Sequence, residues 1–223
     1  METTWKAALA EFIGSFGFVF VGAGSVIVAG PYGSGLLGVA LATGFAVAVM
    51  VSVTAPISGG HLNPAVTAGM LLVRRIDLKT AGLYFGAQLL GAVLASLVVK
   101  GILPWGAVNA TSGGTPQLSS HINLFQGTVL EALFTFLLVS AVFGTAVSAE
   151  APKVGGFGIG LAVFVAALAI GPFTGAALNP ARAVGPALVF KEWHAQAAYW
   201  IGPLIGAGLA ALLWDKFLLR KNV

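Results

Sequence analysis

Two short sequences interrupt an otherwise apolar chain and carry its clearest chemistry. Each reads asparagine, proline, alanine: Asn63, Pro64 and Ala65 in the first, and Asn179, Pro180 and Ala181 in the second. Asparagine is a favourable N-cap and proline fits the first turn of a helix, so both triplets predict a helix that begins inside a loop. Each asparagine can also aim an NH₂ donor at a passing oxygen atom. This chemistry suits the recognition of a small polar solute.

Three charged residues lie within apolar stretches, where an unpaired charge is expensive and usually functional. They are Glu11, Glu131 and Arg182. Intramembrane acids suggest proton transport by default, but these two recur at matching places in the two halves of the chain, which favours a structural role. Arg182 follows the second triplet, where it would donate hydrogen bonds to solutes and repel cations. A pairing of Arg182 with a distant acid, or its extension to the membrane surface, is the less favoured alternative.

The composition requires a membrane rather than water as the main solvent. Of the 223 residues, 58% are hydrophobic and 8% are charged, and the mean hydropathy is +0.97. A soluble domain carries charge on about a quarter of its residues. The chain has no cysteine and hence no disulfide framework. Its formal charge is +4, but the basic residues form no run, so a lipid bilayer and not a nucleic acid is the expected partner.

Hydropathy predicts an all-α integral membrane protein with six transmembrane helices and two re-entrant half-helices. The six apolar stretches that are long enough to span cover 7–29, 35–54, 80–101, 123–147, 156–172 and 195–218. Two shorter apolar stretches, 64–73 and 180–190, follow the two triplets. Ten helical residues reach about 15 Å, which is half of a hydrocarbon core about 30 Å thick.

The distribution of basic residues predicts the orientation. With the N-terminus inside, eight lysines and arginines fall on the inner side and two, Lys100 and Lys191, on the outer side. The inner eight are Lys6, Arg74, Arg75, Lys79, Lys153, Lys216, Arg220 and Lys221. This positive-inside bias predicts a multi-pass protein of the cell (inner) membrane with both termini in the cytoplasm.

The two halves of the chain resemble each other. Residues 57–65 match 173–181, and 38–42 match 158–162. We therefore expect one domain over 1–223, built from repeats at approximately 1–101 and 123–223 and joined by an outer loop over 102–122, which its polar sequence predicts to be a mobile flap. Three spans per half give the repeats opposite orientations, so the two triplets should meet near the membrane midplane.

The residues before each triplet should approach the pore closely. Irregular backbone at membrane depth must line a cavity or be buried in protein. We expect carbonyl groups of two loops to line the pore, those of Gly59, Gly60, His61, Gly175, Ala176 and Ala177. His61 could act as a pH sensor, but its counterpart in the repeat is Ala177, which favours a role in bracing the loop.

These features together resemble the aquaporin, or major intrinsic protein, family. The resemblance rests on the two triplets, on the wider strings SGGHLNPAVT and NPAR, and on the inverted repeat, and it covers essentially the whole chain. It implies a passive channel that passes water and small uncharged solutes, excludes protons and ions, and forms a homotetramer with one pore per subunit. It also implies that Glu11 and Glu131 brace the re-entrant loops, and that no enzyme activity, cofactor or metal is involved.

The resemblance further implies a four-residue selectivity filter near the outer mouth. Counting from the motifs assigns it to Thr43, Ala167, Ala176 and Arg182. Strict water channels of the family have a large aromatic residue and a histidine at the first two positions, whereas glycerol channels have two aromatic residues and an aspartate after the arginine. This chain has neither pattern. Three small filter residues are similar to bacterial relatives of the plant nodulin-like intrinsic proteins, some of which pass neutral metalloid acids.

The candidate solutes are therefore water together with glycerol, urea, or arsenous, boric or silicic acid. A strict water channel is the alternative within the family, and the Tyr199-Trp200 pair is more typical of that group. The rival from another class is an ion-coupled secondary transporter, which also uses inverted repeats but needs coupling-ion ligands. The three scattered histidines, His61, His121 and His194, do not form a metal site.

Two glycine pairs with four-residue spacing predict close helix packing. Gly82 and Gly86 form the first pair, and Gly202 and Gly206 form the second. Such pairs let helices approach each other closely. We expect both to pack within one subunit, and a contact between subunits is the alternative.

Overall fold

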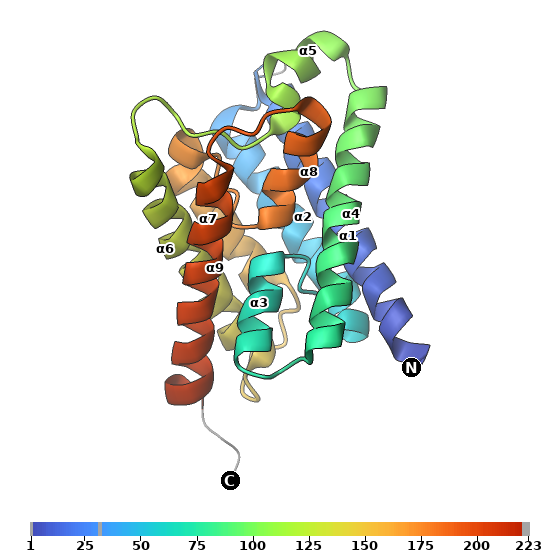
Figure 1. The fold of residues 1–223 in the computed structure, drawn as a ribbon, viewed down its shortest axis with the longest axis vertical. Helices are drawn as coiled ribbons and strands as arrows, with labels where there is room; N and C mark the ends of the chain where they lie inside the picture. Colours follow the sequence, from blue (N-terminus) through green and yellow to red (C-terminus); the bar gives the residue numbers. More distant parts are fainter. Residues whose placement is uncertain (1, 31–32, 220–223) are drawn as a thin grey trace.

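The computed structural model describes residues 2–30 and 33–219, and it is a bundle of long helices around two short ones (Figure 1). The long helices are α1 (Glu2–Ala29), α2 (Gly35–Ser58), α4 (Leu78–Ile102), α6 (Leu124–Val142), α7 (Phe157–Thr174) and α9 (Gln196–Leu213). Single π-helical turns, η2 (Phe143–Val147) and η3 (Trp214–Leu218), extend α6 and α9. All six are long and apolar enough to cross a membrane, which confirms the predicted spans.

The two short helices are α3 (Pro64–Leu72) and α8 (Pro180–Phe190), and each begins at the proline of a triplet. Asn63 and Asn179 are their N-caps, and each side-chain oxygen accepts a hydrogen bond from a backbone N–H of the first turn. In Figure 1, α3 and α8 occupy the lower and upper halves of the bundle, between α4 and α9. The half-helices are therefore present where the sequence predicts them.

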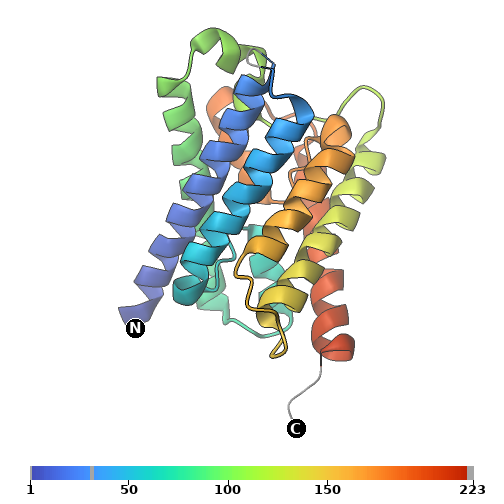
Figure 2. The same cartoon turned by 180° about the vertical axis from the view of Figure 1, so that it is seen from behind.

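Three helix pairs make the closest contacts: α1 with α4, α2 with α7, and α6 with α9. Figure 2 shows α1, α2, α7 and α6 side by side on the opposite face of the bundle. A glycine lies at the crossing point of each pair. A methyl group at Gly91, Gly160 or Gly206 would clash with a backbone carbonyl oxygen of the partner helix. Backbone contact at these points is what brings the long helices close together.

The two predicted glycine pairs have different environments. Gly202 and Gly206 of α9 lie against the backbone of α6, as predicted. Gly82 and Gly86 of α4 have no other described residue within 4 Å of the position that a Cβ atom would take. The prediction of packing within the subunit is therefore wrong for this pair, because α4 turns that face away from the rest of the bundle.

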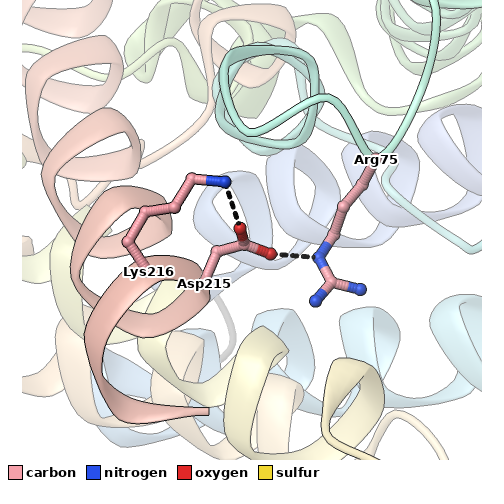
Figure 3. Close-up of polar contacts among 3 residues, drawn as sticks. All are labelled: Arg75, Asp215 and Lys216. Carbon is pink, nitrogen blue, oxygen red and sulfur yellow. Dashed lines mark hydrogen bonds and ion pairs between the residues drawn. The ribbon is translucent and has the colours of Figure 1, made fainter. Parts of the chain in front are cut away.

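Ion pairs connect helix ends at one end of the bundle (Figures 1 and 3). This end contains the start of α1 and the end of η3. Arg75, between α3 and α4, donates a hydrogen bond of 2.7 Å from Nε to Asp215 in η3, and Lys216 Nζ lies 2.8 Å from the same carboxylate. The guanidinium of Arg75 also lies 5.7 Å from the ring centroid of Phe143. These contacts fix the loop after α3 to the ends of α6 and α9. Arg220 and Lys221, which the orientation count includes, lie outside the described residues.

The segment over 102–122 differs from the predicted mobile flap. It forms helix α5 (Trp105–Ala110) and a short 3₁₀ turn, η1 (Ser112–Gly114). Val108 packs with Ile27 of α1 and Val99 of α4. Gly114 lies so close to the backbone of Ala23 that a Cβ atom there would clash, and its φ of 71° suits glycine. The polar character of the segment does not predict this packing, which depends on Gly114 and the buried Val108.

Candidate functional site

The two triplets meet at the centre of the bundle and hold each other. Asn63 Nδ2 donates a hydrogen bond of 2.9 Å to the carbonyl oxygen of Leu178, and Asn179 Nδ2 donates one of 2.8 Å to the carbonyl oxygen of Leu62. The side-chain oxygens cap α3 and α8. An amide NH₂ group has two N–H bonds, so each asparagine keeps one donor for a solute after the cross-contact is made.

Both short helices begin at this junction. Helix N-termini carry a positive partial charge, because their first N–H groups have no partner within the helix. The ends of α3 and α8 therefore place two positive ends beside Asn63 and Asn179. Such an arrangement favours the oxygen end of a polar molecule and disfavours a cation.

The loops that lead to the two triplets share one unusual backbone conformation. Positive φ angles occur at Gly59, Gly60 and Leu62 in the first loop and at Gly175, Ala176 and Leu178 in the second. The positions correspond one to one. The one difference in residue type is Ala176, which has a φ of 45° where the first loop has Gly60. A non-glycine residue in this region costs about 1–2 kcal/mol, so the surrounding contacts must hold the loop in place.

Two buried glutamates supply these contacts. Glu11 accepts hydrogen bonds from Ser58 Oγ at 2.6 Å and from the backbone N–H groups of His61 at 2.9 Å and Leu62 at 2.6 Å. Without Glu11, two buried backbone donors would lose their acceptor. The carboxylate thus provides acceptors for backbone N–H groups of the loop, as carbonyl oxygens do within a helix or a sheet.

Glu131 has the same relation to the second loop. It accepts from Thr174 Oγ1 at 2.6 Å, from Ala177 N at 3.0 Å and from Leu178 N at 2.7 Å. Two tyrosine hydroxyls form hydrogen bonds with the backbone at the ends of α2 and α7. Tyr84 donates to the carbonyl of Ser58, and Tyr199 to that of Thr174.

The first loop has one extra layer of hydrogen bonds. Gln88 of α4 donates from Nε2 to Glu11 at 2.8 Å and to Thr67 at 2.9 Å. Thr67 Oγ1 in turn lies 3.0 Å from His61 Nδ1, and the His61 ring meets Tyr84 edge to face with 5.3 Å between centroids. His61 is therefore held on two sides, in agreement with a bracing role.

Two cavities lie along the bundle, and the junction itself forms part of the wall of the inner one. The inner one is narrow, about 30 Å³. Its wall includes Asn63 and Asn179, with Gly60, His61 and Ala177 from the two loops. A single water needs about 10–15 Å³ measured in this way, so the cavity has room for two or three waters.

The outer cavity is a wider vestibule of about 370 Å³. Arg182, Ala167 and Gly175 lie at its base, and the loop over 114–117 forms part of its wall. Arg182 is buried, with 5% of its surface exposed. Its Nη1 atom has no hydrogen-bond partner among residues 2–30 and 33–219, which leaves a donor available to a solute.

Stripes of small and apolar residues connect the two cavities. On α2, Val39 lines the vestibule and Val47 and Val51 line the inner cavity. On α7, Ala167 and Gly171 line the vestibule, and Ile159 and Val163 line the inner cavity. Residues four apart lie on one face of a helix, so each helix presents one continuous face to both cavities. The two cavities therefore follow one another along the same faces of α2 and α7.

The structure brings the predicted filter residues only partly together. Arg182 and Ala167 line the vestibule. Thr43 lies on the α2 stripe, halfway between Val39 and Val47, and lines neither cavity, but it and Arg182 both border Gly22 of α1. Ala176 and Gly59 line neither cavity, although Ala176 is buried.

Two parts of the wall lie outside the residues that the sequence predicts, in addition to the apolar stripes of α2 and α7 and to Leu138 and Val142 of α6. One is the loop over 114–117, where Pro116 contacts Gly175. The other is α1, which contributes Phe18 to the inner cavity and Val26 to the vestibule. The eight-residue spacing of these two residues was a usable signal, because it places both on one face of α1. A metal site is not indicated in the described residues, since no three His, Cys, Asp or Glu side chains gather there.

Comparisons with known proteins agree with this geometry. The family model described as Major intrinsic protein matches residues 1–214. Aquaporin TIP4-4 of Zea mays is 44% identical over 97% of this chain and 88% of its own length. Aquaporin TIP2-1 of Arabidopsis thaliana is 40% identical over 97% and 89%. The X-ray structure of the aquaglyceroporin from Plasmodium falciparum superposes with a TM-score of 0.85 at 25% identity and covers 96% of both chains.

Proposed function

This chain belongs to the major intrinsic protein family of membrane channels, and we propose that it passes water and small uncharged solutes passively through the path between its two cavities. The observation that carries the proposal is the junction of Asn63 and Asn179. Two free amide donors and two helix N-termini meet there, in the wall of the inner cavity of about 30 Å³.

Exclusion of ions follows from the charge of the path. Arg182 is the one lysine, arginine or acid that lines either cavity in the described part of the chain. The positive ends of α3 and α8 add to its barrier against cations. The narrow part has too few ligands to replace the hydration shell of an anion or a cation. The same donors orient the central water, which interrupts a relay of protons.

The size limit depends on the filter. Thr43, Ala167 and Ala176 are all small, and pore diameter sets the size of the solute that can pass. We infer that glycerol, urea and neutral metalloid acids (arsenous, boric or silicic acid) pass together with water. The relatives bear TIP names rather than nodulin-like ones, so the inference about metalloids rests on the small filter residues. A strict water channel is the alternative, as the relatives' name aquaporin suggests.

A secondary transporter is the candidate from a different class. It would need ion ligands or a proton relay at the midplane. Glu11 and Glu131 are the acids closest to the junction, and their oxygens accept hydrogen bonds from the two loops. This occupation favours the channel. Saturable uptake driven by an ion gradient would support the transporter instead.

The assembly and placement of the channel are part of the proposal. We propose a single domain of two inverted repeats, approximately 1–101 and 123–223, in a homotetramer with one pore per subunit. The matching loops before the two triplets support the repeat. The basic residues at the end of the bundle shared by α1 and η3 support two cytoplasmic termini in a cell (inner) membrane.

Light-scattering stopped flow on proteoliposomes tests the proposal. Water, urea, glycerol and arsenous acid are compared with empty liposomes, at several solute concentrations and with and without an ion gradient. We expect passive flux that does not saturate, together with no proton or potassium current. Flux of water alone would establish the strict water channel, and flux that requires an ion gradient would overturn the channel.

A further inference from the structure

Gly22 of α1 lies beside Arg182 and Thr43, where α1 presents backbone without a side chain. A Cβ atom placed on Gly22 would lie 3.4 Å from Arg182 Nε. It would lie 3.6 Å from Cγ2 and 3.7 Å from Oγ1 of Thr43. The two predicted filter residues that stand farthest apart in the chain therefore meet at this one glycine.

The position of Gly22 along α1 is also that of a pore residue. Phe18 lines the inner cavity and Val26 lines the vestibule. Gly22 lies four residues from each, on the same face of the helix. Neither cavity reaches Gly22 itself, and along α1 it lies between the two residues that line them. Its level matches that of Thr43 on the α2 stripe.

We propose that Gly22 determines the width of the selectivity filter, because its missing side chain lets the Arg182 guanidinium lie back against α1. This rests on the proposed function and names a specificity residue within it. Arg182 Nη1 has no hydrogen-bond partner among the described residues, so no such bond at this atom opposes a shift of the guanidinium. A side chain at position 22 would therefore move the guanidinium toward the path, and the opening would become smaller.

The distances give a graded expectation. The Cβ atom of an alanine would be in ordinary contact with Arg182 and Thr43. A valine adds two methyl groups about 1.5 Å beyond Cβ. They would overlap Arg182 or Thr43, and one of the two side chains must then shift. Large solutes should lose permeability before water does, because they need the full opening.

The test compares Gly22→Ala and Gly22→Val with the matched control Gly24→Val. Gly24 lies on the same helix, and no other described residue lies within 4 Å of its Cβ position. The control therefore has the same cost of a β-branched residue in a helix without a contact at the filter. Water, urea and glycerol permeability are measured per reconstituted channel.

We expect Gly22→Val to lower glycerol permeability about tenfold, with a smaller loss for urea and the smallest for water. Gly22→Ala should lower the ratio of glycerol to water about twofold, and Gly24→Val should match the wild type. If the wild type passes water alone, water permeability becomes the readout for all three variants. Equal permeabilities in Gly22→Val and Gly24→Val would overturn the inference. If Gly22→Val does not fold, a ratio of glycerol to water permeability in Gly22→Ala equal to that of the wild type would overturn it instead.

A second variant separates a narrowed filter from a damaged helix. Thr43→Ala removes both Thr43 atoms that face Gly22, so the double variant Gly22→Val, Thr43→Ala should regain several times the flux of Gly22→Val alone. Flux that stays equally low in the double variant would contradict a role in filter width. A wild type without any flux above empty liposomes would instead overturn the proposed function, and the two failures are therefore distinguishable.

Discussion

Replacement of Glu131 by glutamine tests the bracing of the second loop. The carboxylate accepts three hydrogen bonds, two at Oε1 from Thr174 and Ala177 and one at Oε2 from Leu178. An amide has one acceptor oxygen and one NH₂ donor. Whichever way the amide turns, the N–H of either Ala177 or Leu178 faces another donor. The substitution therefore leaves at least one buried backbone N–H unpaired.

The size of the effect follows from these contacts. A buried donor without a partner costs about 1–3 kcal/mol, and a hydrogen bond to a charged group is worth about 1.5–3 kcal/mol. We therefore expect Glu131→Gln to lower the free energy of unfolding by about 3 kcal/mol. For a chain of this length each kcal/mol shifts the Tm by about 2–4 °C, so the Tm should fall by roughly 6–12 °C.

The assay is thermal unfolding in detergent, followed by tryptophan fluorescence, together with water permeability per folded channel. The Tm should fall while the ratio of glycerol to water permeability stays near that of the wild type. Glu11→Gln should have the same effect through the first loop. Glu192→Gln is the control, because Glu192 accepts a hydrogen bond from His194 on the exposed surface. An unchanged Tm in Glu131→Gln would refute the reasoning, since it would mean that the loop does not need all three hydrogen bonds to this carboxylate.

Three further predictions concern the scaffold. Gly206→Ala should destabilise the protein by about 1–3 kcal/mol, because its methyl group meets the backbone of α6, whereas Gly86→Ala should be tolerated; thermal unfolding of both variants checks this. Hydrogen bonds from the backbone N–H and the hydroxyl of Thr80 hold the pKa of Asp77, the N-cap of α4, below its ordinary value of 3.8. A group with a lowered pKa stabilises the fold above that ordinary value and loses its effect as the pH falls through the folded pKa. Asp77→Ala should therefore lower the Tm at neutral pH but not at the lowest pH, while Asp77→Asn, which keeps a cap but has no titratable carboxyl, should lose this contribution to the pH dependence; a pH series of Tm values decides. Arg75→Ala should cost about 1 kcal/mol through its ion pair and its contact with an aromatic ring, and the loss should shrink at high salt in a Tm titration.

Some of the chain's architecture follows from the sequence by itself. The six spans and two half-helices agree with the structure because hydropathy, length and N-capping are local properties. Asn63 and Asn179 identify their own helix starts, since a cap acts within three residues of itself. The matching acids Glu11 and Glu131 also signal a shared task, as an acid in an apolar stretch is too costly to be incidental.

Other features depend on residues that are distant in the sequence. The bonds from Asn63 and Asn179 to the opposite loop, and the contact of Gly22 with Arg182, span more than a hundred positions. A glycine has no side chain whose chemistry would indicate a contact with Arg182 in the sequence. The same reason explains the unexpected packing of the 102–122 segment and the open face of Gly82 and Gly86. Sequence determined where the helices and polar groups are, because those signals are local. The tertiary structure alone decided which backbone surfaces come close enough to form the wall of the path.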